Sequence, residues 1–235
     1  MKTETNQTTG GVNMARRSFL RYAGAGAAAV AVLGASSCRK SYDNPPTDTS
    51  TLPHIDIGMG DIGILNYAYA LEQLEAAFYL QVIATPYSGI SIAETAYLTD
   101  IRDHEVLHRD FFKTALGSSA IVSLTPDFST INFSDRSQVL KAAKTLEDTG
   151  VTAYDGAGYL IQNPDYLTIA GKIVSVEARH AALIANLITP GTFVEPDQVD
   201  ENGINRSATI AQVLAAANTL LKTKVYAASF NYPLK

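Results

Sequence analysis

Apolar residues recur at helical spacing in five stretches of the chain, and this pattern predicts a mainly helical protein. In the first stretch, residues 61–84, apolar side chains return every three or four positions, which places them on one face of a helix. These side chains are Ile64, Leu65, Ala68, Leu71, Leu74, Phe78 and Val82. The other four stretches predict helices over residues 92–116, 136–161, 165–188 and 208–222.

The lengths of the connections predict how these helices pack. Only a short turn separates the first two helices, and Asn163-Pro164 makes a tight turn between the third and the fourth. Residues 118–133, in contrast, are long enough to run from one end of a bundle to the other. Short, long and short connections are typical of a four-helix bundle with one crossover. We therefore predict an all-α fold, with the fifth helix packed across the bundle.

Residues at the helix ends support these boundaries. Asp61 is a candidate cap for the first helix, and Ser134 or Asp135 for the third, because their side chains accept hydrogen bonds from free backbone N–H groups. Gly117 is suited to end the second helix. Pro164 fits the first turn of the fourth helix, where no backbone N–H is needed.

One spacing of chemical groups occurs twice, on the second and fourth predicted helices. Each copy is Glu-x-x-His, which places a carboxylate and an imidazole one turn apart on the same helix face. The first and third helices each carry a further glutamate upstream of these copies. The candidate metal ligands are Glu72, Glu105, His108, Glu147, Glu177 and His180. Four helices that carry four carboxylates and two imidazoles are typical of a dinuclear carboxylate site in a bundle core.

This ligand set favours iron or manganese, because divalent forms of both metals bind oxygen and imidazole ligands. In the usual arrangement the glutamate of each Glu-x-x-His bridges two ions, each upstream glutamate binds one ion, and each histidine completes one. The cofactor is therefore expected to be two iron ions, manganese, or a mixed iron–manganese pair. Glu75 is an alternative to Glu72, but its counterpart on the third helix is Gly150, which favours Glu72. No catalytic residue is assigned.

Two tyrosines accompany the upstream glutamates. Tyr79 and Tyr154 each follow a candidate ligand by seven residues, which is two helical turns along the same face. We expect them to support the site by hydrogen bonding to the carboxylates behind the metals. His104 is expected at the surface or beside the ligands, and His54 is expected to be inert.

The beginning of the chain has the features of an export signal. Arg16-Arg17 precedes the short apolar run of residues 22–35, which resembles a twin-arginine signal. An ordinary secretory signal or a single anchor is the alternative, and Met14 could be the start instead of Met1. Cys38 follows two serines, as in a lipoprotein processing site, although a free cysteine beside a conventional cleavage site is equally consistent.

The chain therefore divides into four predicted parts, and its composition limits the classes of partner that it can bind. These parts are a signal over residues 1–37, a flexible tether over 38–60, the bundle over 61–190, and a C-terminal loop and packing helix over 191–235. The net charge of −5 argues against nucleic acid, which needs a basic face. A single cysteine excludes a disulfide within the chain and a four-cysteine metal site.

Four segments together resemble the ferritin-like family of exported bacterial proteins that also includes plant desiccation-related proteins. The segments are residues 70–79, 104–108, 146–154 and 177–180, and the resemblance covers about residues 58–188. It implies a ferritin-like four-helix fold, whereas the family's biochemical activity is poorly defined. Rubrerythrin-like relatives are excluded because they carry an additional four-cysteine domain. A storage cage is disfavoured because a tether on every subunit would crowd a closed shell.

These observations lead to three hypotheses about function. The first is a periplasmic or envelope metalloprotein that reacts with oxygen or peroxide, with ferroxidase-like or peroxide-detoxifying activity in stress defence. The second is a non-enzymatic desiccation or stress protein in which the metal is structural or vestigial. The third is an enzyme similar to di-manganese catalase. The partners considered are metal ions, small oxidants, a second copy of the chain, and a membrane reached through a lipid on Cys38.

Overall fold

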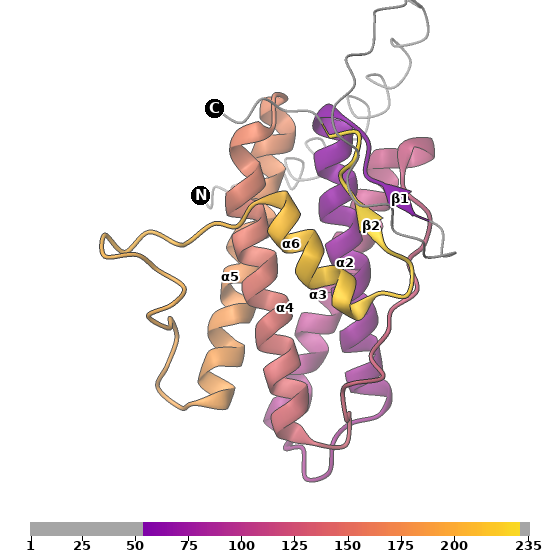
Figure 1. Cartoon of the computed structure of the whole chain (residues 1–235). Helices are drawn as coiled ribbons and strands as arrows, with labels where there is room; N and C mark the ends of the chain where they lie inside the picture. Colours follow the sequence, from indigo (N-terminus) through magenta and orange to yellow (C-terminus); the bar gives the residue numbers. More distant parts are fainter. Residues whose placement is uncertain (1–53, 231–235) are drawn as a thin grey trace, which may run out of the picture. The chain divides into compact units, whose positions relative to one another are not determined.

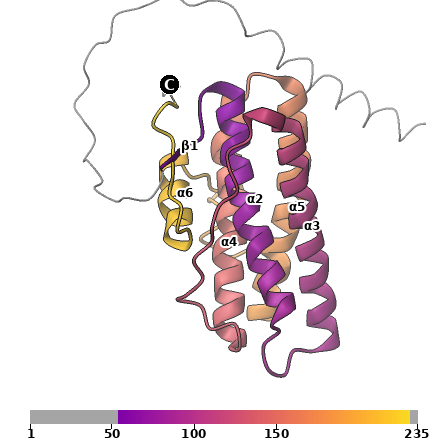
Figure 2. The ribbon, with the colours of Figure 1, turned by 90° about the vertical axis from the view of Figure 1, so that its right-hand side faces the viewer.

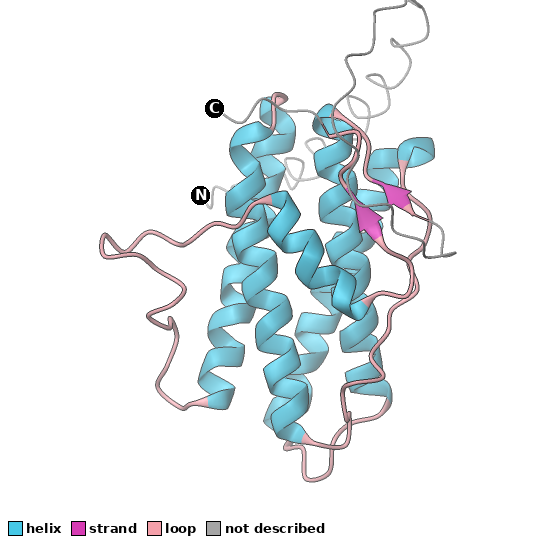
Figure 3. Ribbon diagram, viewed as in Figure 1, coloured by secondary structure: helices cyan, strands magenta, loops and turns pink. Residues whose placement is uncertain are grey.

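The fold is all-α, as predicted, and its core is a bundle of four long helices (Figures 1 and 3). A computed structural model describes residues 54–230; the signal motif, Cys38 and most of the expected tether lie outside this part. The long helices are α2 (Gly60–Ala84), α3 (Ile92–Leu116), α4 (Arg136–Ala157) and α5 (Pro164–Ile188). A short helix, α6 (Ile210–Ala217), follows them.

The connections have the predicted short, long and short pattern. Helices α2 and α3 form one hairpin, and α4 and α5 form the other. Between the hairpins, the crossover of residues 120–135 runs alongside the bundle from one end to the other (Figure 2). Within residues 54–230, no helix is long and apolar enough to cross a bilayer.

Most of the predicted helix-end signals act where expected. Gly117 ends α3 with a positive φ of 54°, a conformation that glycine adopts without strain. The Asp135 side chain caps α4 by accepting hydrogen bonds from the backbone of Ser137 and Gln138. Helix α5 begins with Pro164, after an Asn163 cap.

The prediction that Asp61 caps the first helix is wrong. Helix α2 begins after Met59, which makes no side-chain cap. The Asp61 carboxylate instead accepts hydrogen bonds from the backbone N–H groups of Gln162 and Asn163, at 2.9 and 2.8 Å. It therefore ties the start of α2 to the turn between α4 and α5, whose own N–H groups would otherwise lack a partner.

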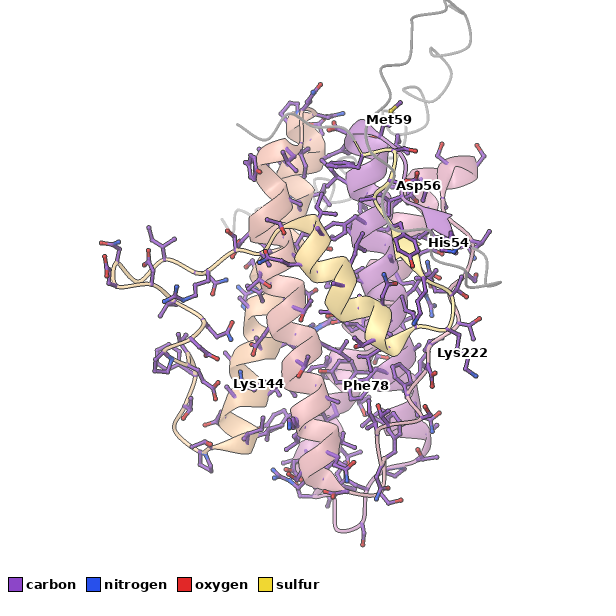
Figure 4. The ribbon with its side chains drawn as sticks, viewed as in Figure 1. His54, Asp56, Met59, Phe78, Lys144 and Lys222 are labelled. Atoms are coloured by element: carbon purple, nitrogen blue, oxygen red, sulfur yellow. The ribbon has the colours of Figure 1, made fainter. Side chains whose placement is uncertain are left out.

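Helix α2 is the central element of the fold, and it is buried on nearly every side. Its neighbours are α3, α4, α6 and the crossover. Two polar side chains on α2 hold the crossover: Asn66 bonds the backbone of Ser119 and Ile121, and Gln73 accepts from Leu124 N. Phe78, labelled in Figure 4, packs on aromatic rings of the same segment.

The C-terminal segment closes over the bundle, as predicted for a packing helix. Helix α6 runs obliquely over α4 and α2 (Figure 1). Beyond it, β2 (Val225–Tyr226) pairs in parallel with β1 (Ile55–Asp56), and His54 stacks on the Tyr226 ring. Residues 55–60 thus differ from the flexible tether expected there, because β1 gains backbone hydrogen bonds from a distant strand.

We expect a Gly156→Ala substitution to destabilise the protein by about 2 kcal/mol, as overpacking does in a rigid interior. A Cβ at Gly156 would lie 1.8 Å from the Ala208 carbonyl oxygen, so the backbone leading into α6 would have to move. Gly171→Ala is the matched control, since nothing lies within 4 Å of its Cβ position. Urea denaturation gives the free energies of unfolding. Equal stability of the two variants would contradict this packing.

Candidate metal centre

The candidate ligands come from all four long helices and lie in the bundle core. Glu72, Glu105, Glu147 and Glu177 are 0% exposed as whole residues, and His180 is also buried. Ile101, Phe112, Ile173 and Ile184, which belong to α3 and α5, are buried as well. Four buried carboxylates in such a setting require compensation by protons or cations, because an unpaired buried charge is very costly.

The first half of the site combines residues from α2, α3 and α5. His108 Nδ1 lies 2.9 Å from Glu177 Oε1, 3.4 Å from Glu72 Oε2 and 3.8 Å from Glu105 Oε2. One ligand atom from each of these four residues lies within 4.8 Å of the others, so the group could hold one metal ion.

The second half repeats this arrangement with residues from α3, α4 and α5. His180 Nδ1 lies 2.9 Å from Glu105 Oε1, 3.4 Å from Glu147 Oε2 and 3.5 Å from Glu177 Oε2. These residues form a second group that could hold an ion. Glu105 and Glu177 belong to both groups, each with one oxygen toward either half. Each group could therefore hold an ion, and Glu105 and Glu177 would be available to both.

The orientation of the side chains fits metal ions better than a network of hydrogen bonds. Within residues 54–230, several buried polar atoms have no hydrogen-bond partner, and eight of them belong to the six candidate ligands. They are Glu72 Oε2, both oxygens of Glu105, His108 Nδ1, Glu147 Oε2, both oxygens of Glu177, and His180 Nδ1. Each histidine nitrogen lies 2.9–3.8 Å from carboxylate oxygens, yet none of these contacts is a hydrogen bond. Buried polar groups are almost always satisfied, so a shared cation is the simplest missing partner.

Without metal, the cluster holds protons in place of cations. Burial would lower the pKa of His108 and of His180, but the surrounding carboxylates outweigh it and raise both to about 12. Burial raises the pKa of Glu147 to about 8 and that of Glu72 well above its usual value. For Glu105, burial is outweighed by the two imidazoles, and the pKa falls to about 2.

The two tyrosines lie where the spacing predicts, and each supports a glutamate of the other hairpin. The Tyr79 hydroxyl on α2 donates to Glu147 Oε1 on α4, and the Tyr154 hydroxyl on α4 donates to Glu72 Oε1 on α2. In both glutamates the second oxygen, Oε2, remains directed at the histidine. The tyrosines thus fix the carboxylates in the orientation that a metal would need.

His104 supports only one half of the site. Its Nδ1 lies 2.9 Å from His180 Nε2, and the two rings are stacked. Burial and the neighbouring His180 lower the pKa of His104, so the neutral ring can accept a hydrogen bond from the Nε2–H of His180. This leaves His180 Nδ1 facing the carboxylates. His104 itself is exposed, which connects this half of the centre to the protein surface.

Glu75 lies outside both groups of candidate ligands, whereas Glu72 is part of one. Its side chain points toward α4, where a Cβ at Gly150 would lie 3.0 Å from Glu75 Oε1. Gly150 therefore leaves room for this carboxyl group. Sequence spacing alone could not distinguish the two glutamates; the absence of a side chain at position 150 was the available signal.

Comparison with known proteins agrees with this architecture. The family model for the ferritin-like domain matches residues 60–190, which contain all six candidate ligands. A search of curated proteins finds no match. With its four-helix bundle, its single crossover and this extensive match, the chain belongs to the ferritin-like domain family.

Proposed function

We propose that the protein is an exported metalloprotein whose two iron ions, or manganese, or one of each, react with oxygen or hydrogen peroxide. The observation that carries this proposal is the pair of four-residue groups that share Glu105 and Glu177. Residues shared in this way would hold two redox ions close together, and such a pair would supply the two electrons that reduction of peroxide to water requires. The expected role is ferroxidase-like or peroxide-detoxifying activity in stress defence.

The protein's own residues support such chemistry in three ways. The burial of Glu72, Glu105, Glu147, Glu177 and His180 keeps these ligands from bulk water. Tyr79 and Tyr154 hold the outer glutamates in place. His104 offers a contact between the buried His180 and the surface.

Export is proposed from the sequence alone. The Arg16-Arg17 motif resembles a signal that transports folded proteins, so metals could be inserted before transport. A lipid on Cys38 would then hold the domain at a membrane of the envelope.

A purely structural metal site is the second candidate. It is favoured by the complete burial of the four glutamates, because a cation there would neutralise their charge and strengthen the bundle. A ferritin-like stress or desiccation protein of this kind would bind the ions without turnover.

Stopped-flow measurements on protein loaded with Fe(II) without oxygen distinguish these two candidates. We expect one hydrogen peroxide to oxidise about two Fe(II) per chain and, with two protons, to give two waters. This oxidation should be at least tenfold faster than that of Fe(II) in buffer. Bound iron that oxidises no faster than the buffer sample would sink the enzyme proposal and leave the structural one. The Glu105→Ala/Glu177→Ala variant serves as the unbound control.

A further inference from the structure

A cavity lies on the side of the bundle where α6 and the crossover cover α2 and α4. Its volume is about 520 Å³, which is within the range of small-molecule binding sites. Leu71 and Leu74 of α2, Leu146 of α4 and Leu220 after α6 give it an apolar wall. It shares no residue with the six candidate metal ligands.

One acid, Glu75, belongs to the wall of this cavity and is only 3% exposed. In the part of the chain that the structure describes, its carboxyl group forms no hydrogen bond or ion pair with the protein. The Glu75 oxygens are not among the fully enclosed polar atoms that lack a hydrogen-bond partner, so a molecule in the cavity can reach the carboxyl group. Gly150 keeps the space beside this carboxyl group open.

The remaining polar side chains of the wall, which also include Thr130, Gln138 and Thr219, are exposed or half-buried and so lie near the entrance. Lys141, Thr145 and Thr149 follow one another at four-residue intervals on α4, and all three line the cavity. Lys141 and Thr145 are exposed, and Thr149 is half-buried. The wall therefore changes from a solvent-exposed polar entrance to an apolar interior with one carboxyl group.

We propose that this cavity binds a small, neutral organic molecule with an apolar body and one hydroxyl or carbonyl oxygen, which hydrogen-bonds to Glu75. Burial raises the pKa of Glu75 well above its usual value, because the charged form would lose its hydration beside the apolar wall. A neutral carboxyl group both donates and accepts hydrogen bonds, so it suits an alcohol, phenol or ketone.

Charged ligands are excluded by the same surroundings. An anion would lose its hydration against the apolar wall, because Lys141 is available only at the exposed entrance, and an ammonium ion would lose its hydration opposite an uncharged acid. This inference concerns binding alone, and it holds whether or not the metal centre turns over.

Calorimetric titration of the full chain, with its metals as purified, tests the proposal with cyclohexanol and cyclohexylamine as probes. We expect one cyclohexanol per chain and, at pH 7, at least about tenfold weaker binding of the amine, which is then a cation. Ala142→Phe fills the cavity and should weaken cyclohexanol binding at least about tenfold. Ala178→Phe, at an alanine of α5 that does not line this cavity, should leave it unchanged.

The Glu75 variants give an independent readout if the larger phenylalanine perturbs the fold. Glu75→Gln keeps a donor and an acceptor and should bind cyclohexanol within about twofold of the wild type. Glu75→Leu should bind it about fivefold more weakly, the value of one net hydrogen bond. Three results would each overturn the proposal. They are no binding of cyclohexanol, equal binding of cyclohexanol and the amine, and the same affinity for cyclohexanol in Ala142→Phe and Glu75→Leu as in the wild type. Metal content and iron oxidation, measured on the same samples, report separately on the proposed function.

Discussion

Replacing both Glu105 and Glu177 by alanine should abolish metal binding, so that about two divalent ions per chain in the wild type become about none in the variant. These two glutamates belong to both groups of candidate ligands. Their loss leaves each group with one carboxylate and one imidazole, too few to bind iron or manganese tightly. Mass spectrometry of metal content, after loading with Fe(II) or Mn(II) without oxygen, measures the difference directly.

A matched control separates loss of ligands from loss of charge. Asp197→Ala/Glu201→Ala removes the same number of carboxylates from exposed positions of the loop between α5 and α6. It should still bind both ions. A wild-type protein that retains no stoichiometric metal under these conditions would show that the centre is vestigial.

The second large effect concerns how the free energy of unfolding changes with pH. It should fall with rising pH in the metal-free protein, whereas the stabilisation by bound metal should rise with pH. In the metal-free fold, Glu147 keeps a proton from its usual pKa of 4.5 up to about 8. His108 and His180 keep theirs from 6.5 up to about 12. The folded state thus binds more protons than the unfolded state in these windows. Its stability must fall as pH rises, by roughly 1.4 kcal/mol for each pH unit and each retained proton.

Metal ions reverse this trend because they replace the same protons. Loading should release about four protons per chain, from His108, His180, Glu72 and Glu147. Affinity therefore rises with pH, and each ion at a hundredfold excess over its Kd adds about 2.7 kcal/mol to the stability.

Urea denaturation at pH 5 and pH 8, with a chelator or with Mn(II), measures both halves of this prediction. We expect the chelated protein to be more stable at pH 5 and the stabilisation by Mn(II) to be larger at pH 8. Below pH 4.5 the trend in the metal-free protein should reverse. Glu105 has a pKa of about 2 in the folded state, so in this range it is protonated in the unfolded state but not in the folded state, and stability falls as pH falls. Metal-free protein that gains stability between pH 5 and pH 8 would contradict the assigned protonation.

The sequence was sufficient to predict the long helices and to predict that the candidate ligands lie close together, because both depend on local periodicity. An apolar residue every three or four positions defines a buried face whatever it packs against. A carboxylate three residues before an imidazole on that face must point the same way. The placement of Tyr79 and Tyr154 follows from the same geometry.

Features that depend on distant segments could not be read in this way. Asp61 looks like a helix cap, but the α4–α5 turn, a hundred residues later, provides better donors. Residues 55 and 56 look flexible until a strand from the C-terminal segment pairs with them. Glu75 is on a second buried face of α2 that exists only because α4 and α6 cover it. His104 meets His180 only when α3 and α5 pack together.

The crossed tyrosines have a consequence for how the centre is assembled. Because each hairpin supplies the hydroxyl that orients a glutamate of the other, neither hairpin alone presents a finished binding group. Tight capture of metal therefore reports that both halves of the chain have docked. A partly folded chain would bind iron weakly, so a redox-active ion would be retained only after the four-helix bundle has formed.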